Sequence, residues 1–259
     1  LVRSSAKNYK DVVVITSTDQ YKDLVRELNF YNGATSLKFR EKLSKDAFMK
    51  TANYDALIFN YFNNISKIDI PDKLIFNGDL IQKLRYGENP HQFAAIYSNS
   101  DELKLKKLHG KELSYNNYKD IFASLKLSKT LPKNTGVVIV KHMNPSGVSI
   151  EKKHIKSYVS AMNCDPISAF GGIVTCNFKL SYSVAKEIIK NYYEVVIANG
   201  FDKSAIRLLK NKKNLRLIDS SKVNLKSKID IISGIDSYLI QSNDNLILSK
   251  KNLKVVSKI

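Results

Sequence analysis

Short runs of apolar, mostly β-branched residues alternate with segments of helical periodicity through the second half of the chain. These runs occupy residues 137–140, 172–176, 195–198 and 215–218. Each run is too short for a helix, and strands that alternate with helices are typical of a sheet covered on both faces. The sequence therefore predicts an α/β fold here, in which ligands bind beyond the carboxyl ends of the strands.

Other segments extend this pattern. Helical periodicity predicts helices over residues 118–127, 154–162, 181–191 and 203–211, and shorter apolar runs predict strands over residues 94–97, 237–241 and 253–256. Nearer the start, residues 12–15 predict a strand and residues 16–19 a helix N-cap before a helix. Residues 37–62 predict a long helix with a break near Lys45 and Asp46. Residues 1 to about 65 are thus expected to be mixed α/β, and the unpatterned stretch 63–73 is expected to link two domains.

Composition excludes several classes of protein. The chain has 259 residues, of which 43% are hydrophobic, so it is too apolar for a disordered segment. No apolar run approaches the ~18 residues that a membrane-spanning helix needs, and the first residues do not resemble a signal peptide. Cys164 and Cys176 have no second pair, which argues against a disulfide framework or a four-cysteine zinc site. We expect a cytoplasmic protein with no membrane association.

The net charge of +18 raises the question of nucleic-acid binding. Only 6 of the 42 basic residues are arginine, the residue that favours bidentate recognition of phosphates and bases. The lysines are scattered among Asn and Ile, which is typical of a solvated surface. Nucleic acid is therefore an unfavoured partner, although a basic nucleic-acid-binding module is kept as the alternative function. The charge also suits small anionic substrates.

Four segments are dense in polar residues and glycine: 84–92, 111–117, 141–147 and 165–172. In the third, Lys141 and His142 follow a buried strand where it opens into a Pro/Gly turn. A neighbouring ammonium disfavours protonation of an imidazole, which keeps it available as a base. Gly171 and the next glycine allow backbone N–H groups to approach a ligand. Arg85 and Tyr86 offer a forked donor beside an aromatic face, which suits an anionic or planar ligand.

Together these segments resemble one family. With their flanking residues, the stretches 84–92, 110–117, 140–148 and 165–172 read LRYGENPHQ, GKELSYNN, VKHMNPSGV and DPISAFGG. This is similar to the bifunctional purine-biosynthesis family that joins AICAR formyltransferase to IMP cyclohydrolase. The segments 2–8 and 51–55 also resemble the closing stretches of that family's cyclohydrolase domain, so the likeness covers essentially the whole chain.

The resemblance implies a methylglyoxal-synthase-like domain followed by a cytidine-deaminase-like transformylase domain. Residues 1–68 would be the C-terminal part of the first, 69–73 a linker, and 74–259 the N-terminal half of the second. The chain would then be an internal fragment with exposed apolar edges, and an inactive truncated fragment is a further alternative. A deaminase-like fold raises the question of zinc, but the H-x-E and P-C-x-x-C signatures are missing, so no metal is expected.

The family's reactions are formyl transfer from the cosubstrate 10-formyltetrahydrofolate to AICAR and closure of formyl-AICAR to IMP, in a homodimer. By resemblance His142 is the base of formyl transfer, Lys141 supports charge on the formyl group, and Lys7 is the catalytic lysine of ring closure. The nucleotide would be bound by six further residues: Arg85, Tyr86, Asn117, Phe170, Gly171 and Glu194, the last expected at the end of a helix.

Overall fold

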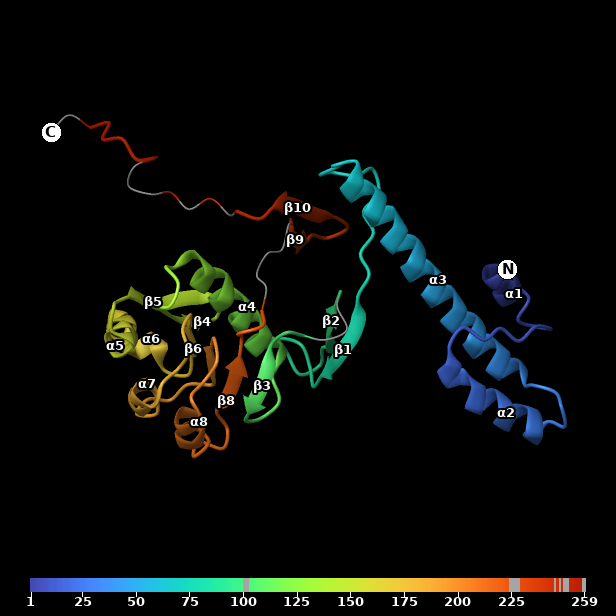
Figure 1. Cartoon of the computed structure of the whole chain (residues 1–259), viewed down its shortest axis with the longest axis horizontal. Coiled ribbons are helices and arrows are strands. Elements are labelled where there is room, and N and C mark those ends of the chain that lie inside the picture. The colour runs from blue at the N-terminus through green and yellow to red at the C-terminus, as the bar shows by residue number, and fades with distance from the viewer. Residues whose placement is uncertain (100–102, 224–228, 245, 247, 249–251, 258–259) are drawn as a thin grey trace. The chain divides into compact units, whose positions relative to one another are not determined.

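The computed structural model describes residues 1–259 except 100–102, 224–228, 245, 247, 249–251 and 258–259 (Figure 1). It divides the chain into two compact units, Leu1–Asp79 and Leu80–Ile259. The described residues contain no helix both long enough and apolar enough to span a bilayer.

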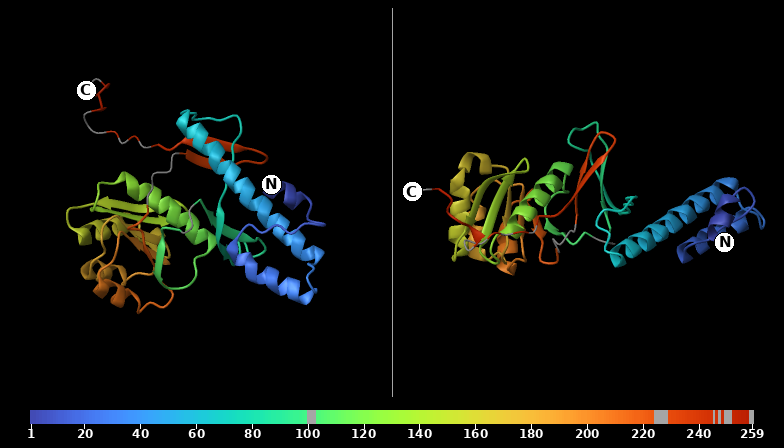
Figure 2. Two further views of the ribbon diagram at one scale, coloured as in Figure 1. Left: turned by 45° about the vertical axis from the view of Figure 1, so that its right-hand side comes forward. Right: turned by 90° about the horizontal axis from the view of Figure 1, so that it is seen from above.

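The first unit is helical. It contains α1 (Val2–Lys7), the short 3₁₀ helix η1 (Thr18–Gln20), α2 (Tyr21–Phe30) and the 29-residue helix α3 (Leu37–Ile65). Figures 1 and 2 show α1 and α2 beside the amino-terminal part of α3. Ala6 and Ala47 are fully buried between α1 and α3, and Ser44 Oγ donates a hydrogen bond to the carbonyl of Ala6 at 2.6 Å. Small residues at this contact let the two helices approach closely.

Three expectations for this unit are wrong. Residues 12–15 form no strand, and the unit is helical rather than mixed α/β. Val14 packs on α3 instead, and the carbonyls of Tyr9 and Lys10, just before this run, accept hydrogen bonds from the Arg40 guanidinium. The helix α3 also continues through the expected break, because Leu43 and Ala47 keep one face buried across it.

The second unit contains a six-stranded mixed sheet in the order β3-β8-β7-β6-β4-β5. Its strands are β3 (Lys106–His109), β4 (Gly136–Lys141), β5 (Asn144–Ile150), β6 (Ile173–Cys176), β7 (Val195–Ala198) and β8 (Arg216–Asp219). β6, β7 and β8 are parallel, whereas β3 and β4 run antiparallel to their neighbours. The four expected apolar runs are confirmed as strands.

Helices cover both faces of this sheet, as the sequence predicts. On one face lie α5 (His154–Cys164), α7 (Tyr182–Ile188) and α8 (Lys203–Leu209), and on the other lies α4 (Tyr115–Thr130). Alternate residues of β7 show the division, because Val196 packs with the first group and Val195 and Ile197 pack with α4. The central strands β4, β6 and β7 are therefore buried on both sides, which explains their continuous apolar sequence.

Two two-stranded ribbons lie outside this sheet, and the second of them is antiparallel. β1 (Asp79–Leu84) pairs with β2 (Ala94–Ser98), and β9 (Ile229–Ser233) pairs with β10 (Tyr238–Ser242), where Ile232 and Leu239 are exposed. The short helix α6 (Pro166–Ala169) precedes β6. Residues 253–256, expected as a strand, are not one. The sequence missed β1, β3, β5 and β9; β5 contains Pro145, which an edge strand tolerates because one row of its amides is unpaired.

Both cysteines are free thiols, so no disulfide links these elements. Cys176 is buried in β6, and burial raises the pKa of its thiol to about 12. Cys164 is exposed at the end of α5. The sheet is therefore held by packing and hydrogen bonds.

Candidate active site at one edge of the sheet

His142 lies at the tip of a tight hairpin. Lys141 ends β4 and pairs with Asn144, which begins β5, so His142 and Met143 are the only two turn residues. Both have left-handed backbones, with φ of 52° and 65°. Such two-residue turns favour Asn and Gly, and non-glycine residues held in this conformation are often found at functional sites. The expected Pro/Gly turn is thus wrong: the Pro and Gly that follow lie in β5.

The tip is held from α4 by a carboxylate. Asp120 Oδ1 accepts a hydrogen bond from the Met143 amide at 2.7 Å. Within the hairpin, Asn144 Nδ2 donates to the His142 carbonyl at 3.0 Å. These two bonds stabilise the turn that presents the imidazole.

Lys141 connects the hairpin to the glycine-containing turn before β6. Its Nζ donates to the carbonyl of Phe170 at 2.8 Å. Gly171 follows with a left-handed φ of 73°, and its N–H donates to the carbonyl of Tyr192 at 2.9 Å. The Phe170 ring is 61% exposed and lies 5.1 Å from the Tyr192 ring, centroid to centroid. This turn therefore presents an aromatic face beside the ammonium of Lys141.

Glu194 lies directly before β7 and not at the end of a helix, because α7 ends at Ile188. Its Oε2 accepts a hydrogen bond from Asn117 Nδ2 at 2.8 Å and is 3.7 Å from Arg216 Nη1. Asn117 is buried and also forms a capping box with Ser114 at the start of α4. The capping box holds the Asn117 side chain in place, so that its amide group orients the Glu194 carboxylate.

A cavity of about 330 Å³, here called the first cavity, brings these groups together. Its lining residues are Ser114, Asn116, Asn117, Asp120, Lys141, His142, Phe170, Gly171, Ile173 and Glu194. It lies at the amino ends of β6 and β7, so the expected place beyond the carboxyl ends of the parallel strands is wrong. The reason is the antiparallel β4, which delivers its own carboxyl end, with Lys141, to this edge.

A second cavity, of about 650 Å³, shares Ser114 with the first. Four cationic side chains line it: Lys83, Arg85, Lys111 and Arg216. Among the described residues that line it, the one carboxylate is Glu112, whose hydrogen bonds from Lys107 and Gln82 hold its pKa below the usual range. Arg85 Nη2 donates to the Tyr86 hydroxyl at 2.9 Å and its guanidinium lies over that ring. The excess of positive charge suits an anionic group.

Eight of the nine expected site residues thus line these two adjoining cavities. Lys7 does not: it is the exposed last residue of α1 in the first unit, and the strand expected after it is absent. Sequence reasoning missed Asp120 and Arg216. Asp120 follows Asn117 by three residues on α4, so helical periodicity could have placed both on one face. Arg216 carries no local signal, because its link to Glu194 depends on strand pairing.

Replacing Asp120 by alanine is expected to loosen the tip of the hairpin. A hydrogen bond to a carboxylate contributes ~1.5–3 kcal/mol, so hydrogen exchange of the Met143 amide should rise about tenfold or more. Asp120→Asn keeps an acceptor oxygen, so the exchange rate of its Met143 amide should stay close to that of the unsubstituted chain. Exchange measured by NMR on all three chains checks this, and an unchanged Met143 rate in the alanine variant would contradict it.

The fold and the site together define a mixed α/β protein with two adjoining polar cavities, the second of which carries an excess of positive charge. The family model described as AICARFT/IMPCHase bienzyme matches residues 5–259. The chain belongs to this family.

Its curated relatives are described as bifunctional purine biosynthesis protein PurH. The protein of Bradyrhizobium diazoefficiens is 42% identical over 270 residues, which cover 100% of this chain and 50% of the relative. The protein of Leptospira biflexa is 41% identical over 263 residues, with 100% and 50% covered. The protein of a Thermoanaerobacter species is 39% identical over 262 residues, with 100% and 51% covered. The chain spans about half the length of the curated relatives it matches.

Proposed function

We propose that the protein acts in de novo purine biosynthesis, transferring a formyl group from 10-formyltetrahydrofolate to AICAR and closing formyl-AICAR to IMP. The observation that carries the proposal is the convergence of His142, Lys141 and Glu194 on one cavity, in a chain of the AICARFT/IMPCHase family. A nucleic-acid-binding module is not favoured, because the basic side chains gathered here face a cavity. The enzyme is proposed to be a cytoplasmic homodimer.

The amine of AICAR is a poor nucleophile because its lone pair delocalises into the imidazole ring. In the proposed reaction its nitrogen attacks the formyl carbon, and His142 accepts the proton that the amine loses. The ammonium of Lys141 stabilises the oxyanion that develops on the formyl oxygen. The carbon–N10 bond of the folate then breaks, and the folate nitrogen takes a proton. No step of this scheme requires a metal ion, and none is proposed.

The nucleotide is proposed to span the two cavities. Arg85 and the neighbouring cations of the second cavity suit its phosphate, and the Tyr86 ring suits a planar or sugar face. Asn117 and Glu194 suit hydrogen bonds to its base, ribose or amine. The exposed ring of Phe170, with Gly171 beside it, suits stacking at the other end of the first cavity. In this arrangement the reactive amine lies near His142.

The two units are proposed to serve the two reactions. Residues 1–68 are assigned to a methylglyoxal-synthase-like cyclohydrolase domain, 69–73 to a linker, and 74–259 to the N-terminal half of a cytidine-deaminase-like transformylase domain. In ring closure the carboxamide nitrogen attacks the formamide carbonyl and water is then lost. An ammonium at Lys7 would donate a proton to the departing oxygen.

Binding of AICAR to the chain tests the proposal directly. Isothermal titration calorimetry should detect AICAR, and Arg85→Met should weaken its affinity about tenfold or more, because a charged hydrogen bond to phosphate is lost. Arg85→Lys keeps the charge but loses the forked pair of donors, so its affinity for AICAR should lie between those of the unsubstituted chain and Arg85→Met. If the chain did not bind AICAR but bound polynucleotide with a steep salt dependence, it would instead be the nucleic-acid-binding module.

A further inference from the structure

The segment 191–194, between α7 and β7, contributes one side chain to the lining of the first cavity. It carries Glu194, and its Tyr192 carbonyl accepts the N–H of Gly171. The N–H of Glu194 in turn donates to the carbonyl of Gly172 at 3.0 Å. Any displacement of this segment would therefore move both the Glu194 carboxylate and the glycine turn.

The same segment is anchored from α5 by one buried hydroxyl. The Tyr158 hydroxyl lies 3.1 Å from the Tyr193 hydroxyl and accepts a hydrogen bond from Asn191 Nδ2 at 2.9 Å. Tyr158 is 1% exposed and Tyr193 is 4% exposed. Burial raises the pKa of both phenols, so both keep their protons at any physiological pH. The anchor is thus a permanent neutral hydrogen-bonded pair.

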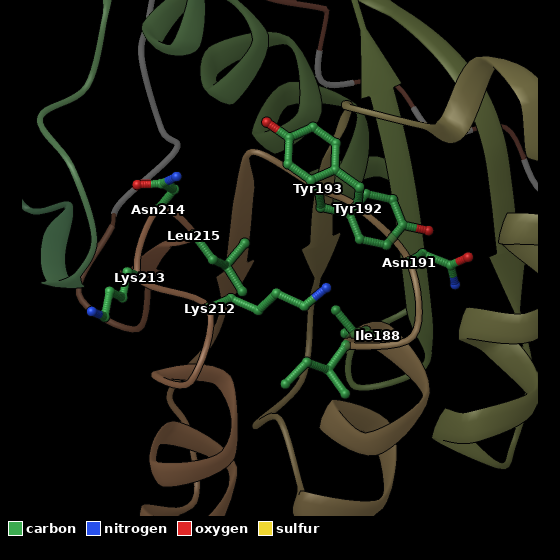
Figure 3. Close-up of a pocket in the computed structure, with 9 residues that line it drawn as sticks. Ile188, Asn191, Tyr192, Tyr193, Lys212, Lys213, Asn214 and Leu215 are labelled. Carbon is green, nitrogen blue, oxygen red and sulfur yellow. The ribbon is translucent and has the colours of Figure 1, made fainter.

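Packing does not fill the other side of the segment. A cavity of about 160 Å³ lies there, lined by Ile188, Ile189, Asn191, Tyr192, Tyr193, Lys212, Lys213, Asn214 and Leu215 (Figure 3). The lining run 212–215 leads directly into Arg216, the ionic partner of Glu194. Both partners of that ion pair therefore follow segments that border empty space. Packing is incomplete on this side, so hydrogen bonds take a larger share in fixing the position of segment 191–194.

We propose that Tyr158 and Tyr193 are positioning residues: their buried hydroxyl pair fixes segment 191–194 and thereby holds Glu194 in place in the first cavity. The pair reaches the cavity through the backbone and touches none of its ligands. Its consequence for nucleotide affinity rests on the proposed function. Glu194 belongs to the proposed binding groups, whereas His142 lies on the separate β4–β5 hairpin. The hydroxyl pair of Tyr158 and Tyr193 therefore acts on substrate binding and not on proton transfer.

Phenylalanine variants test the pair without leaving a cavity, because the rings remain. Tyr158→Phe removes both anchoring bonds, and hydrogen exchange of the Gly171 and Glu194 amides is expected to rise about tenfold. Tyr193→Phe leaves the bond from Asn191 intact and should give a smaller rise. The double variant should match Tyr158→Phe, because the single variant already removes everything that the pair contributes. NMR on the ligand-free chain measures these rates.

Thr175→Val is the matched control. It removes a buried hydroxyl bond of the same kind, from Thr175 to Ser124 at 2.8 Å, on the α4 face of the sheet. It should leave the Gly171 and Glu194 amides protected as before. Equal acceleration in the control would overturn the proposal, since any lost buried bond would then loosen the segment. Unchanged exchange in Tyr158→Phe would overturn it as well.

The enzymatic consequence is measured separately, in the protein at the full length of its relatives. Tyr158→Phe should raise the KM for AICAR about three- to tenfold and leave kcat within about twofold, whereas a general loss of folded protein would lower the apparent kcat instead. An unchanged KM would overturn the link from the hydroxyl pair to the nucleotide. If the unsubstituted protein did not transfer formyl groups at all, the proposed function would fail, and the exchange rates would still decide the positioning role.

Discussion

His142→Asn is expected to lower formyl transfer by about 10²–10⁴-fold, the usual contribution of a general base. Asparagine readily adopts the left-handed backbone found at this position, so the hairpin should be retained while the imidazole is lost. Ring closure of formyl-AICAR should continue at nearly the unsubstituted rate, because the proposed cyclohydrolase residues belong to the other unit. Turnover of each reaction, assayed separately in the protein at the full length of its relatives, provides the measurement.

His91→Asn is the matched control, because His91 is exposed and lines neither of the two adjoining cavities. It should keep both activities. Formyl transfer that survives in His142→Asn would remove His142 from the role of base. Loss of both reactions together would indicate misfolding.

Gly147→Val is expected to destabilise the second unit by about 3 kcal/mol, at the upper end of the range for overpacked sites. A Cβ atom at Gly147 would lie 1.8 Å from the carbonyl oxygen of Ala161, so α5 would have to move away from β5. The contact involves backbone on both sides, and no side-chain rotation can relieve it. Because the chain contains no tryptophan, denaturant unfolding followed by circular dichroism is the appropriate measurement.

Gly200→Ala separates this steric effect from backbone strain. Gly200 has a left-handed φ of 94°, but a Cβ there meets only the flexible side chain of Lys179, at 3.6 Å. Its replacement should cost only about 1 kcal/mol. If the two variants were equally stable, the approach of α5 to Gly147 would not be as close as the structure places it.

The apolar runs of the second unit were predictable because strands buried on both faces leave an uninterrupted signal. β7 reads Val-Val-Ile-Ala and needs no context to be recognised. β5 was not predictable, since Pro145 and Gly147 are turn residues in isolation and become strand residues only at the edge of an assembled sheet. In the first unit the sequence predicted a strand that does not form. The β-branched run 12–15 has no strand beside it, and its Val14 packs on a helix instead.

The candidate site was largely predictable at the level of residues and poorly at the level of geometry. Local motifs pointed to His142 and Lys141, whose neighbours in sequence are also their neighbours in the hairpin. The sequence could not show on which sheet edge the motifs meet, because that depends on the antiparallel direction of β4. Arg216 was missed for the same reason: its partner Glu194 directly precedes the adjacent strand β7 and lies 22 residues away in the chain.

At the tip of the β4–β5 hairpin, the residues that would stabilise the turn best differ from the residues that the proposed reaction needs. Asn-Gly is the pair that a two-residue turn of this kind prefers, and it would relieve the left-handed backbones that His142 and Met143 now adopt. The same exchange would delete the imidazole. An engineering campaign that ranked variants by melting temperature alone would therefore select this position early and obtain a more stable protein without the imidazole to which the proposed function assigns proton transfer.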